Sequence, residues 1–219
     1  MDTSQEGYCF IMNSNIIEKA LILGEKLSTL TSNDGKERSI FFTEESESIM
    51  GVGTEEIIIF CDTKEKKELE AYVDNNKKRD DLSHMHSHAL DATFSVGDIQ
   101  SVKGDWDENK INYQFVITSK HLFSIFIPPD LKYGLNLSKL LIGEYGKMDM
   151  SIWKRVGVKK FKEKDLGKGK KCINIPDCSD EQKIQHNRIW NEEFEKFFKR
   201  WNYINHNQLE YGVVQRKNR

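Results

Sequence analysis

The sequence lacks the features that mark several broad classes of protein. No segment approaches the roughly 18 apolar residues of a membrane-spanning helix, and the opening residues Met1–Glu6 do not resemble a signal peptide. Basic and acidic residues nearly balance, for a formal net charge of -2, which argues against a dedicated nucleic-acid-binding protein. Internal repeats, glycine-rich phosphate loops and low-complexity tracts are also missing. We therefore expect a cytoplasmic protein without a membrane partner, and a segment of a larger secreted polypeptide is equally compatible with the sequence.

Cysteine is scarce as well. The chain has four cysteines and no CxxC pair, so a cysteine-based zinc site is not expected. Cys172 and Cys178 would form a disulfide only in an oxidising compartment. We expect these two residues, together with Cys9 and Cys61, to be free thiols.

Histidine, by contrast, is concentrated in one short segment that contains His84, His86 and His88. Alternate residues of an extended strand point to the same side, so either His86 with His88 or His84 with His86 can approach a single metal ion. Two imidazoles, one carboxylate and one open position form the ligand set of a catalytic zinc site. This segment therefore indicates hydrolytic chemistry, provided that a carboxylate returns to it.

The carboxylate that best meets this requirement is Asp98. Thr93, Ser95 and Gly97 favour a short loop after the histidines, and the residues after Asp98 begin a helical pattern. The apolar residues of that pattern are Ile99, Val102 and Trp106. A carboxylate in the first turn of a helix is stabilised by the helix dipole and held rigidly. The pattern predicts that Asp98 completes the site, and Ser95 is placed to cap the same helix.

Together, His86-Ser87-His88 and Ser95-Val96-Gly97-Asp98 resemble the signature of the JAMM family of zinc metalloproteases, also called JAB or MPN-plus. Ala89 stands where the family usually has proline, and the spacer Ala89–Phe94 is shorter than the commoner one. The resemblance implies that Zn²⁺ is the cofactor.

The resemblance also implies a role for each motif residue. His86, His88 and Asp98 would bind the metal, and Ser95 would stabilise the tetrahedral oxyanion. The pair His86 and His88 is favoured because the family places a small hydroxyl residue between its two histidines. The pair His84 and His86 is the alternative.

The family has a catalytic glutamate just after its first helix, at the opening of a strand. Glu37 occupies this place in the sequence. The resemblance implies that Glu37 holds the reacting water, removes its proton and passes that proton to the leaving amine. Glu44, Glu45 and Glu47 follow shortly afterwards and are the alternatives for this role.

Apolar periodicity predicts the first helix. Apolar residues recur at helical spacing from Ile16 to Leu30. Asn15 and Glu18 are placed to form a capping-box-like start, and Ser32–Gly35 is typical of a helix end.

Strands are expected on both sides of the histidine segment. Lys36–Thr43 begins a strand after the first helix, and the apolar runs Tyr113–Ser119 and Leu122–Ile127 predict a hairpin. We expect an α/β fold. The resemblance implies a JAB/MPN-like curved mixed sheet flanked by the helices that contain Leu21 and Ile99, with a C-terminal helical extension.

At 219 residues, the chain can bury one full core and an appendage. We expect a JAB/MPN-like metalloprotease domain over residues 1–150 and a C-terminal extension over residues 151–219. Within the extension, Lys154–Lys171 is basic and interrupted by glycine, as in a linker. Ser179–Gln182 predicts a capping box that opens a long helix.

Two further segments have alternative interpretations. An aromatic stripe on the long helix favours docking on the core, and a partner-binding face is the alternative. The stripe consists of Trp190, Phe194, Phe197, Phe198 and Trp201. The charged segment Thr63–Asp81 predicts an exposed helix and turn, and a substrate-contacting wall is the alternative because related enzymes often carry an insertion there.

The resemblance implies zinc-dependent hydrolysis of a peptide or isopeptide bond. The expected partner is a protein or peptide substrate, including a ubiquitin-like tail joined to lysine, and not a nucleic acid. A catalytically inactive MPN-like scaffold is the main alternative. A metal-dependent phosphoesterase is a third reading, although such sites generally need more histidines or carboxylates than the sequence supplies.

Overall fold

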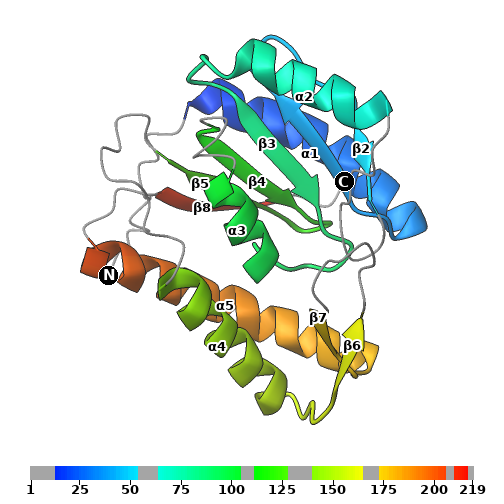
Figure 1. Cartoon of the computed structure of the whole chain (residues 1–219), viewed down its shortest axis with the longest axis vertical. Coiled ribbons are helices and arrows are strands. Elements are labelled where there is room, and N and C mark those ends of the chain that lie inside the picture. The colour runs from blue at the N-terminus through cyan, green and yellow to red at the C-terminus, as the bar shows by residue number, and fades with distance from the viewer. Residues whose placement is uncertain are drawn as a thin grey trace, which may run out of the picture.

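The computed structural model describes residues 13–53, 64–104, 111–127, 140–164, 173–205 and 210–216. Over these residues the protein has an α/β fold built on a six-stranded open sheet with strand order β2-β1-β3-β4-β5-β8 (Figure 1). The strands are β1 (Arg38–Phe42), β2 (Gly51–Val52), β3 (Ser83–Ser87), β4 (Tyr113–Ile117), β5 (His121–Phe126) and β8 (Glu210–Gln215). Only β3 and β4 are parallel, so the sheet is mixed, as expected.

Five helices surround the sheet in the described part of the chain. They are α1 (Ser14–Asp34), α2 (Lys64–Asn76), α3 (Val96–Gly104), α4 (Leu140–Arg155) and α5 (Asp180–Asn205). In Figure 1, α3 crosses in front of the sheet, with α2 on one side of it and the α4 and α5 pair on the other. Because α3 connects two parallel strands, β3, α3 and β4 form a crossover unit.

Helix α1 follows the predicted apolar pattern but begins earlier than expected. Its N-cap is Asn13, whose side chain accepts the N–H of Asn15, so the prediction of a start at Asn15 and Glu18 is wrong. Asn13 is the N-cap because its side-chain oxygen accepts a backbone N–H of the first turn that has no partner within the helix. The helix ends as predicted, at Gly35, whose φ of 72° favours glycine.

The two faces of the sheet have different helical covers. Helix α1 packs on one face and encloses a core of Ile16, Ala20, Leu23, Leu27, Ile40, Phe42, Met85, Tyr113, Phe115, Ile117 and Leu122. Helices α4 and α5 pack on the other face around Phe94, Ile99, Val116, Phe123, Ile125, Ile127, Tyr145, Ile152, Trp190, Phe194 and Phe198. Gly24 allows α1 to approach closely, since a Cβ there would lie 2.9 Å from Ile117 Cδ1.

On the second face of the sheet, strand β3 lies between helix α2 and the pair of helices α4 and α5. Met85 is buried against α1, so the alternation of side chains turns His84 and His86 to the opposite face. On that face, Phe41 of β1 packs with Val73 of α2, whereas Val116 of β4 packs with the α4 and α5 cluster. His84 and His86 therefore lie on this face between the part of the sheet that α2 covers and the part that α4 and α5 cover.

The C-terminal part confirms two expectations. Ser179 and Gln182 form the predicted capping box, with Ser179 N–H donating to Gln182 Oε1 at 2.9 Å and Gln182 N–H donating to Ser179 Oγ at 3.3 Å. The aromatic stripe docks on the core, where Trp190, Phe194 and Phe198 are buried. The side chain of Trp201 lies outside the described residues.

The prediction of a linker over Lys154–Lys171 is wrong for the first part of this segment. Residues 154–164 include the end of α4 and the strand β6 (Phe161–Lys164), which pairs with β7 (Ile173–Pro176) in a separate antiparallel sheet. Burial of Val156 and Val158 gives this segment a packing role that its charge and glycines did not indicate. Position 150, the expected domain boundary, falls inside α4, and β8 returns to pair with β5. No helix in the described ranges combines the length and apolar character that a bilayer span requires.

Candidate metal centre

The donor atoms of His86, His88 and Asp98 converge. One ligand atom from each residue lies within 4.8 Å of the others. The two Nε2 atoms are 3.1 Å apart, His86 Nε2 lies 3.1 Å from Asp98 Oδ1, and His88 Nε2 lies 3.3 Å from Asp98 Oδ2. These three residues form a possible metal site at the carboxyl end of β3.

His84 belongs to a different set of contacts. Its Nε2 is 2.8 Å from Ser39 Oγ, its Nδ1 is 3.0 Å from Gln114 Oε1, and its ring stacks on Phe41. Both ring nitrogens therefore have protein partners on neighbouring strands. The structure thus groups His88, rather than His84, with His86.

Asp98 is held by the start of α3. Ser95 N–H donates to Asp98 Oδ2 at 2.6 Å, and Asp98 N–H donates to Ser95 Oγ at 3.2 Å. This reciprocal capping box satisfies two N–H groups that the helix leaves free, and it fixes the side-chain rotamer of Asp98. The capping role of Ser95 is therefore present in the structure. The helix was predicted through Val102 and Trp106, and both of these side chains lie outside the described residues.

His88 is oriented by its own loop. Its Nδ1 lies 3.0 Å from the carbonyl oxygen of Ala92 and donates a hydrogen bond to it, since a carbonyl can only accept. The Nε2 atom is then the one that faces His86 and Asp98. A second hydrogen bond on a ligand imidazole is the usual way in which proteins orient metal-binding histidines.

The charges of the cluster suit a bound cation. Burial would raise the pKa of Asp98, but His86 and His88 hold it well below its usual range. Burial opposes protonation of His88, yet the Asp98 carboxylate outweighs this effect and raises the pKa of His88 to about 9. Burial lowers the pKa of His86. The group therefore contains an ionised carboxylate that is neutralised by a proton on His88, and a bound metal ion would replace that proton.

The arrangement fits a tetrahedral zinc ion. Donors held at about 2.0–2.1 Å from such an ion are about 3.3 Å from one another. The two Nε2 atoms are 3.1 Å apart, and each lies 3.1 or 3.3 Å from a different oxygen of Asp98. Two nitrogens and one oxygen are also donor types that zinc accepts. His86, His88 and Asp98 would hold the metal, and a fourth position would stay open.

Glu37 lies next to this cluster. Strand β1 pairs antiparallel with β3, with Ser39 opposite His86, so continuing this register puts Glu37, the residue before β1, opposite His88. The pKa of Glu37 is raised to about 7, chiefly by burial, with the charge of His88 acting in the opposite direction and that of Asp98 adding to the rise. A carboxyl group with a pKa near neutrality is suited to general acid and base chemistry.

The alternative glutamates lie beyond the other end of β1. The Glu44 carboxylate interacts with the side chains of Asn13 and Asn15, and the Glu45 carboxylate pairs with Arg79 at 3.1 Å. Glu47 forms an isolated bridge with Phe42. The antiparallel register therefore separates all three from His86 and His88.

Sequence reasoning missed the network that holds the Lys36 carbonyl, directly before Glu37. The buried Arg38 side chain donates to both carboxylate oxygens of Asp34, at 2.9 and 2.7 Å, and to the carbonyl of Lys36 at 2.7 Å. Thr31 Oγ1 donates to the same Lys36 carbonyl at 2.9 Å. The only signal in the sequence was the i,i+4 spacing of Asp34 and Arg38, which on its own indicates a weak surface ion pair.

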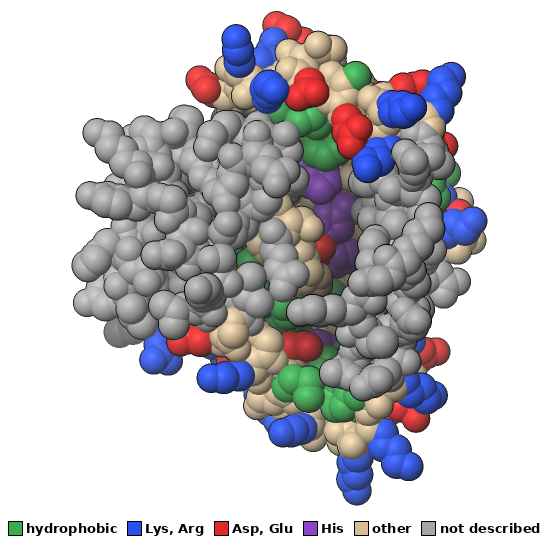
Figure 2. Space-filling model, in the orientation of Figure 1, with side chains coloured by type: hydrophobic (Ala, Val, Ile, Leu, Met, Phe, Trp, Pro, Cys, Tyr) green, Lys and Arg blue, Asp and Glu red, His purple; other side chains and the backbone are tan. Residues whose placement is uncertain are grey.

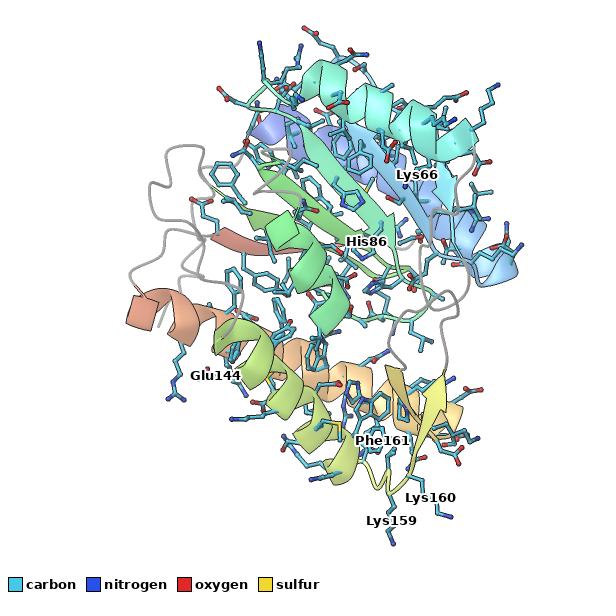
Figure 3. The ribbon with its side chains drawn as sticks, viewed as in Figure 1. Lys66, His86, Glu144, Lys159, Lys160 and Phe161 are labelled. Carbon is cyan, nitrogen blue, oxygen red and sulfur yellow. The ribbon has the colours of Figure 1, made fainter. Side chains whose placement is uncertain are left out.

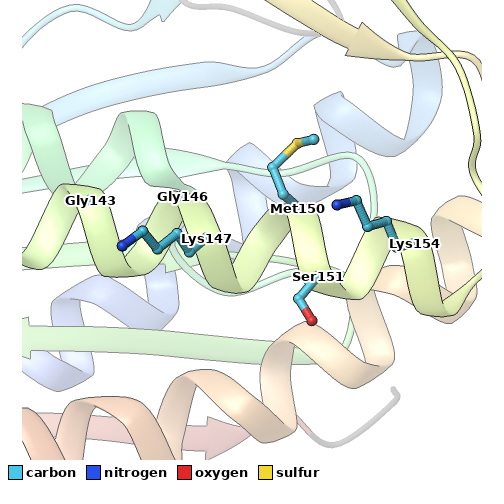
Figure 4. Close-up of a pocket in the computed structure, with 6 residues that line it drawn as sticks. All are labelled: Gly143, Gly146, Lys147, Met150, Ser151 and Lys154. Carbon is cyan, nitrogen blue, oxygen red and sulfur yellow. The ribbon is translucent and has the colours of Figure 1, made fainter.

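Two other surface features lie apart from the histidines. Histidine side chains are visible in the middle of the face shown in Figure 2, between α2 and the α4 and α5 pair. Lys159 and Lys160, in the basic run before β6, lie at the far end of the molecule from His86 (Figure 3). A shallow groove on α4 contains none of the candidate site residues (Figure 4). It is lined by Gly143, Gly146, Lys147, Met150, Ser151 and Lys154.

Comparisons with known protein families, curated proteins and solved structures found no match to this chain. The functional argument therefore depends on the motif and on the geometry of the cluster.

Proposed function

We propose that this protein is a zinc-dependent hydrolase that cleaves a peptide or isopeptide bond, as JAMM proteases do, in a JAB/MPN-like fold. One observation carries the proposal: His86, His88 and Asp98 converge within 4.8 Å, and the half-buried Glu37 lies beside them with a pKa raised to about 7. A purely structural histidine cluster has no need of a half-buried carboxyl group with a raised pKa beside it.

Each residue has a chemical role in this proposal. A zinc ion held by His86, His88 and Asp98 would supply a Lewis acid that lowers the pKa of water and polarises an amide carbonyl. Glu37 accepts a proton from the attacking water and delivers it to the leaving amine. The Ser95 hydroxyl accepts a hydrogen bond from Asp98 N–H and still has its own proton to donate to the substrate oxyanion.

The substrate class follows from the reaction that these groups support. Protonation of a leaving amine by Glu37 is the step that an amide bond needs, in a peptide or in a lysine isopeptide. An extended tail, such as that of a ubiquitin-like protein, would bring its scissile carbonyl to the site by pairing with a sheet edge. Helix α2, which packs beside β1 and β2, is the proposed wall of the substrate groove.

The test is a panel of linear peptides and lysine-linked ubiquitin-like conjugates, incubated with the purified full chain. Cleavage of at least one member is expected, with loss in a zinc chelator and recovery when zinc is restored. An absence of chelator-sensitive cleavage across the panel would favour the inactive scaffold. Chelator-sensitive release of phosphate from an aryl phosphate, without amide cleavage, would favour a phosphoesterase.

The proposed role of α2 needs point variants. Leu69 and Val73 are buried, so deleting the helix would damage the core as well as the groove. Lys64 and Lys67 are exposed, and replacing both by alanine should raise KM while leaving zinc content unchanged. The matched control is Lys183→Ala on α5, which removes an exposed lysine of another helix.

A further inference from the structure

Asn191 of the C-terminal helix α5 forms hydrogen bonds with the loop that joins His88 to Ser95. Asn191 Oδ1 accepts the N–H of Thr93 at 2.8 Å, and Asn191 Nδ2 donates to the carbonyl of Asp91 at 2.9 Å. The amide of Asn191 thus uses its acceptor and one donor on the backbone of a single loop. An asparagine that only filled space between a helix and a sheet would not need this geometry.

The two bonds of Asn191 enclose the residue that orients His88. Ala92 lies between Asp91 and Thr93, and its carbonyl oxygen accepts the Nδ1–H of His88 at 3.0 Å. Fixing the peptide groups before and after Ala92 fixes the direction of this carbonyl. The direction of the carbonyl in turn fixes the plane of the His88 ring and the position of its Nε2 atom.

The far end of the loop is held from the same side of the protein. Tyr145 Oη of α4 and Trp190 Nε1 of α5 both donate to the carbonyl of Phe94, at 3.0 and 3.1 Å. Phe94 directly precedes Ser95, whose capping box sets the rotamer of Asp98. Helices α4 and α5 therefore hold both ends of the segment that brings His88 and Asp98 together.

We infer that Asn191 is a positioning residue for the metal centre, acting on His88 through the Ala92 carbonyl, and that α5 is a working part of the site. This inference rests on the proposed zinc site. It does not depend on which amide bond the protein cleaves. It gives α5 a role in the metal site, although the sequence motifs place this helix in the C-terminal extension, outside the catalytic domain.

The experiment measures the zinc affinity of the full chain by competition with a chromophoric chelator, and the visible absorption of the cobalt-substituted protein. Asn191→Ala removes both bonds. Asn191→Asp keeps the shape and the acceptor for Thr93 N–H but loses the donor to Asp91. Gln185→Ala, at an exposed position of the same helix, is the control.

Asn191→Ala should bind zinc about tenfold more weakly than wild type, within the range found for outer residues of metal sites, and should shift the cobalt absorption bands. Asn191→Asp should fall between Asn191→Ala and wild type, and Gln185→Ala should match wild type. Circular dichroism checks folding, and if Asn191→Ala is unfolded, the folded Asn191→Asp variant decides the question.

The failures of the inference and of the proposed function are distinguishable. Wild-type zinc affinity and cobalt bands in the Asn191 variants, with only a lower melting temperature, would show that Asn191 merely docks the helix and would overturn the inference alone. If wild type itself binds no zinc, the proposed function and the inference are both refuted.

Discussion

The side-chain oxygens of Thr31 and Ser87 lie 2.6 Å apart in the protein interior. Ser87 also accepts the N–H of Arg38 at 2.9 Å, so the residue between His86 and His88 is tied to α1 and to the start of β1. These bonds place the opening of β1, and Glu37 with it, beside the histidines. The small hydroxyl residue of the motif thus has a structural reason in this protein.

The first prediction concerns this contact. Ser87→Ala should lower the free energy of unfolding by about 1–3 kcal/mol, because it removes the side-chain oxygen that accepts the buried N–H of Arg38 and one of the hydrogen-bond partners of the Thr31 hydroxyl. Urea denaturation measures the change. Ser32→Ala, at an exposed position of α1, should have little effect. A Ser87→Ala variant as stable as wild type would show that the contact contributes nothing.

The second prediction concerns the metal ligands. Alanine at His86, His88 or Asp98 should abolish stoichiometric zinc binding, because each substitution removes one of three protein ligands. His84→Ala should retain zinc, since the nitrogens of His84 bond to Ser39 and Gln114. Elemental analysis after dialysis measures the zinc content. Equal zinc in His88→Ala and wild type, with loss in His84→Ala, would reverse the assignment.

The third prediction concerns the base. Glu37→Gln should keep zinc bound and reduce turnover by about 100- to 10,000-fold, because the amide cannot accept a proton from water. Rates on the cleaved member of the substrate panel measure the effect, with zinc content determined on the same samples. Glu47→Gln is the matched control at the other end of β1. Loss of turnover in Glu47→Gln, with full turnover in Glu37→Gln, would refute the role of Glu37.

The fourth prediction concerns acid stability. The hydrogen bonds from Arg38, followed by that from Lys36, lower the pKa of Asp34 to about 2 from a usual value of 3.8. A carboxylate with a lowered pKa in the folded state stabilises the protein above its unfolded pKa, and this stabilisation is lost as the pH falls toward its folded pKa. Asp34→Asn should therefore lose less stability than wild type between pH 4 and pH 2.

Urea denaturation at several pH values tests this difference. The stability curve of wild type should fall more steeply with acid than that of Asp34→Asn, and the two curves should run parallel above pH 5. If the curves are parallel over the whole range, the contact between Asp34 and Arg38 does not persist in solution.

Local features of the sequence predicted much of the site. The alternation of His86 and His88 on a strand, and the capping pair of Ser95 and Asp98, depend on residues that are close in the chain. The β4 and β5 hairpin was predicted for the same reason, because its two apolar runs are adjacent. The prediction of a capping-box-like start at Asn15 and Glu18 failed because Asn13, an equally good capping residue, caps α1 instead.

The sequence by itself determined the types of the candidate ligands, their order and the strand and helix that present them, since these follow from short-range periodicity. Only the tertiary structure decided which glutamate and which histidine join the cluster. That choice depends on the register of β1 against β3, where a shift of one residue would turn every side chain to the other face. The contact of Asn191 with the His88 loop was also visible only in the tertiary structure. It joins residues about 100 positions apart, and a local sequence pattern does not reveal contacts between residues so far apart in the chain.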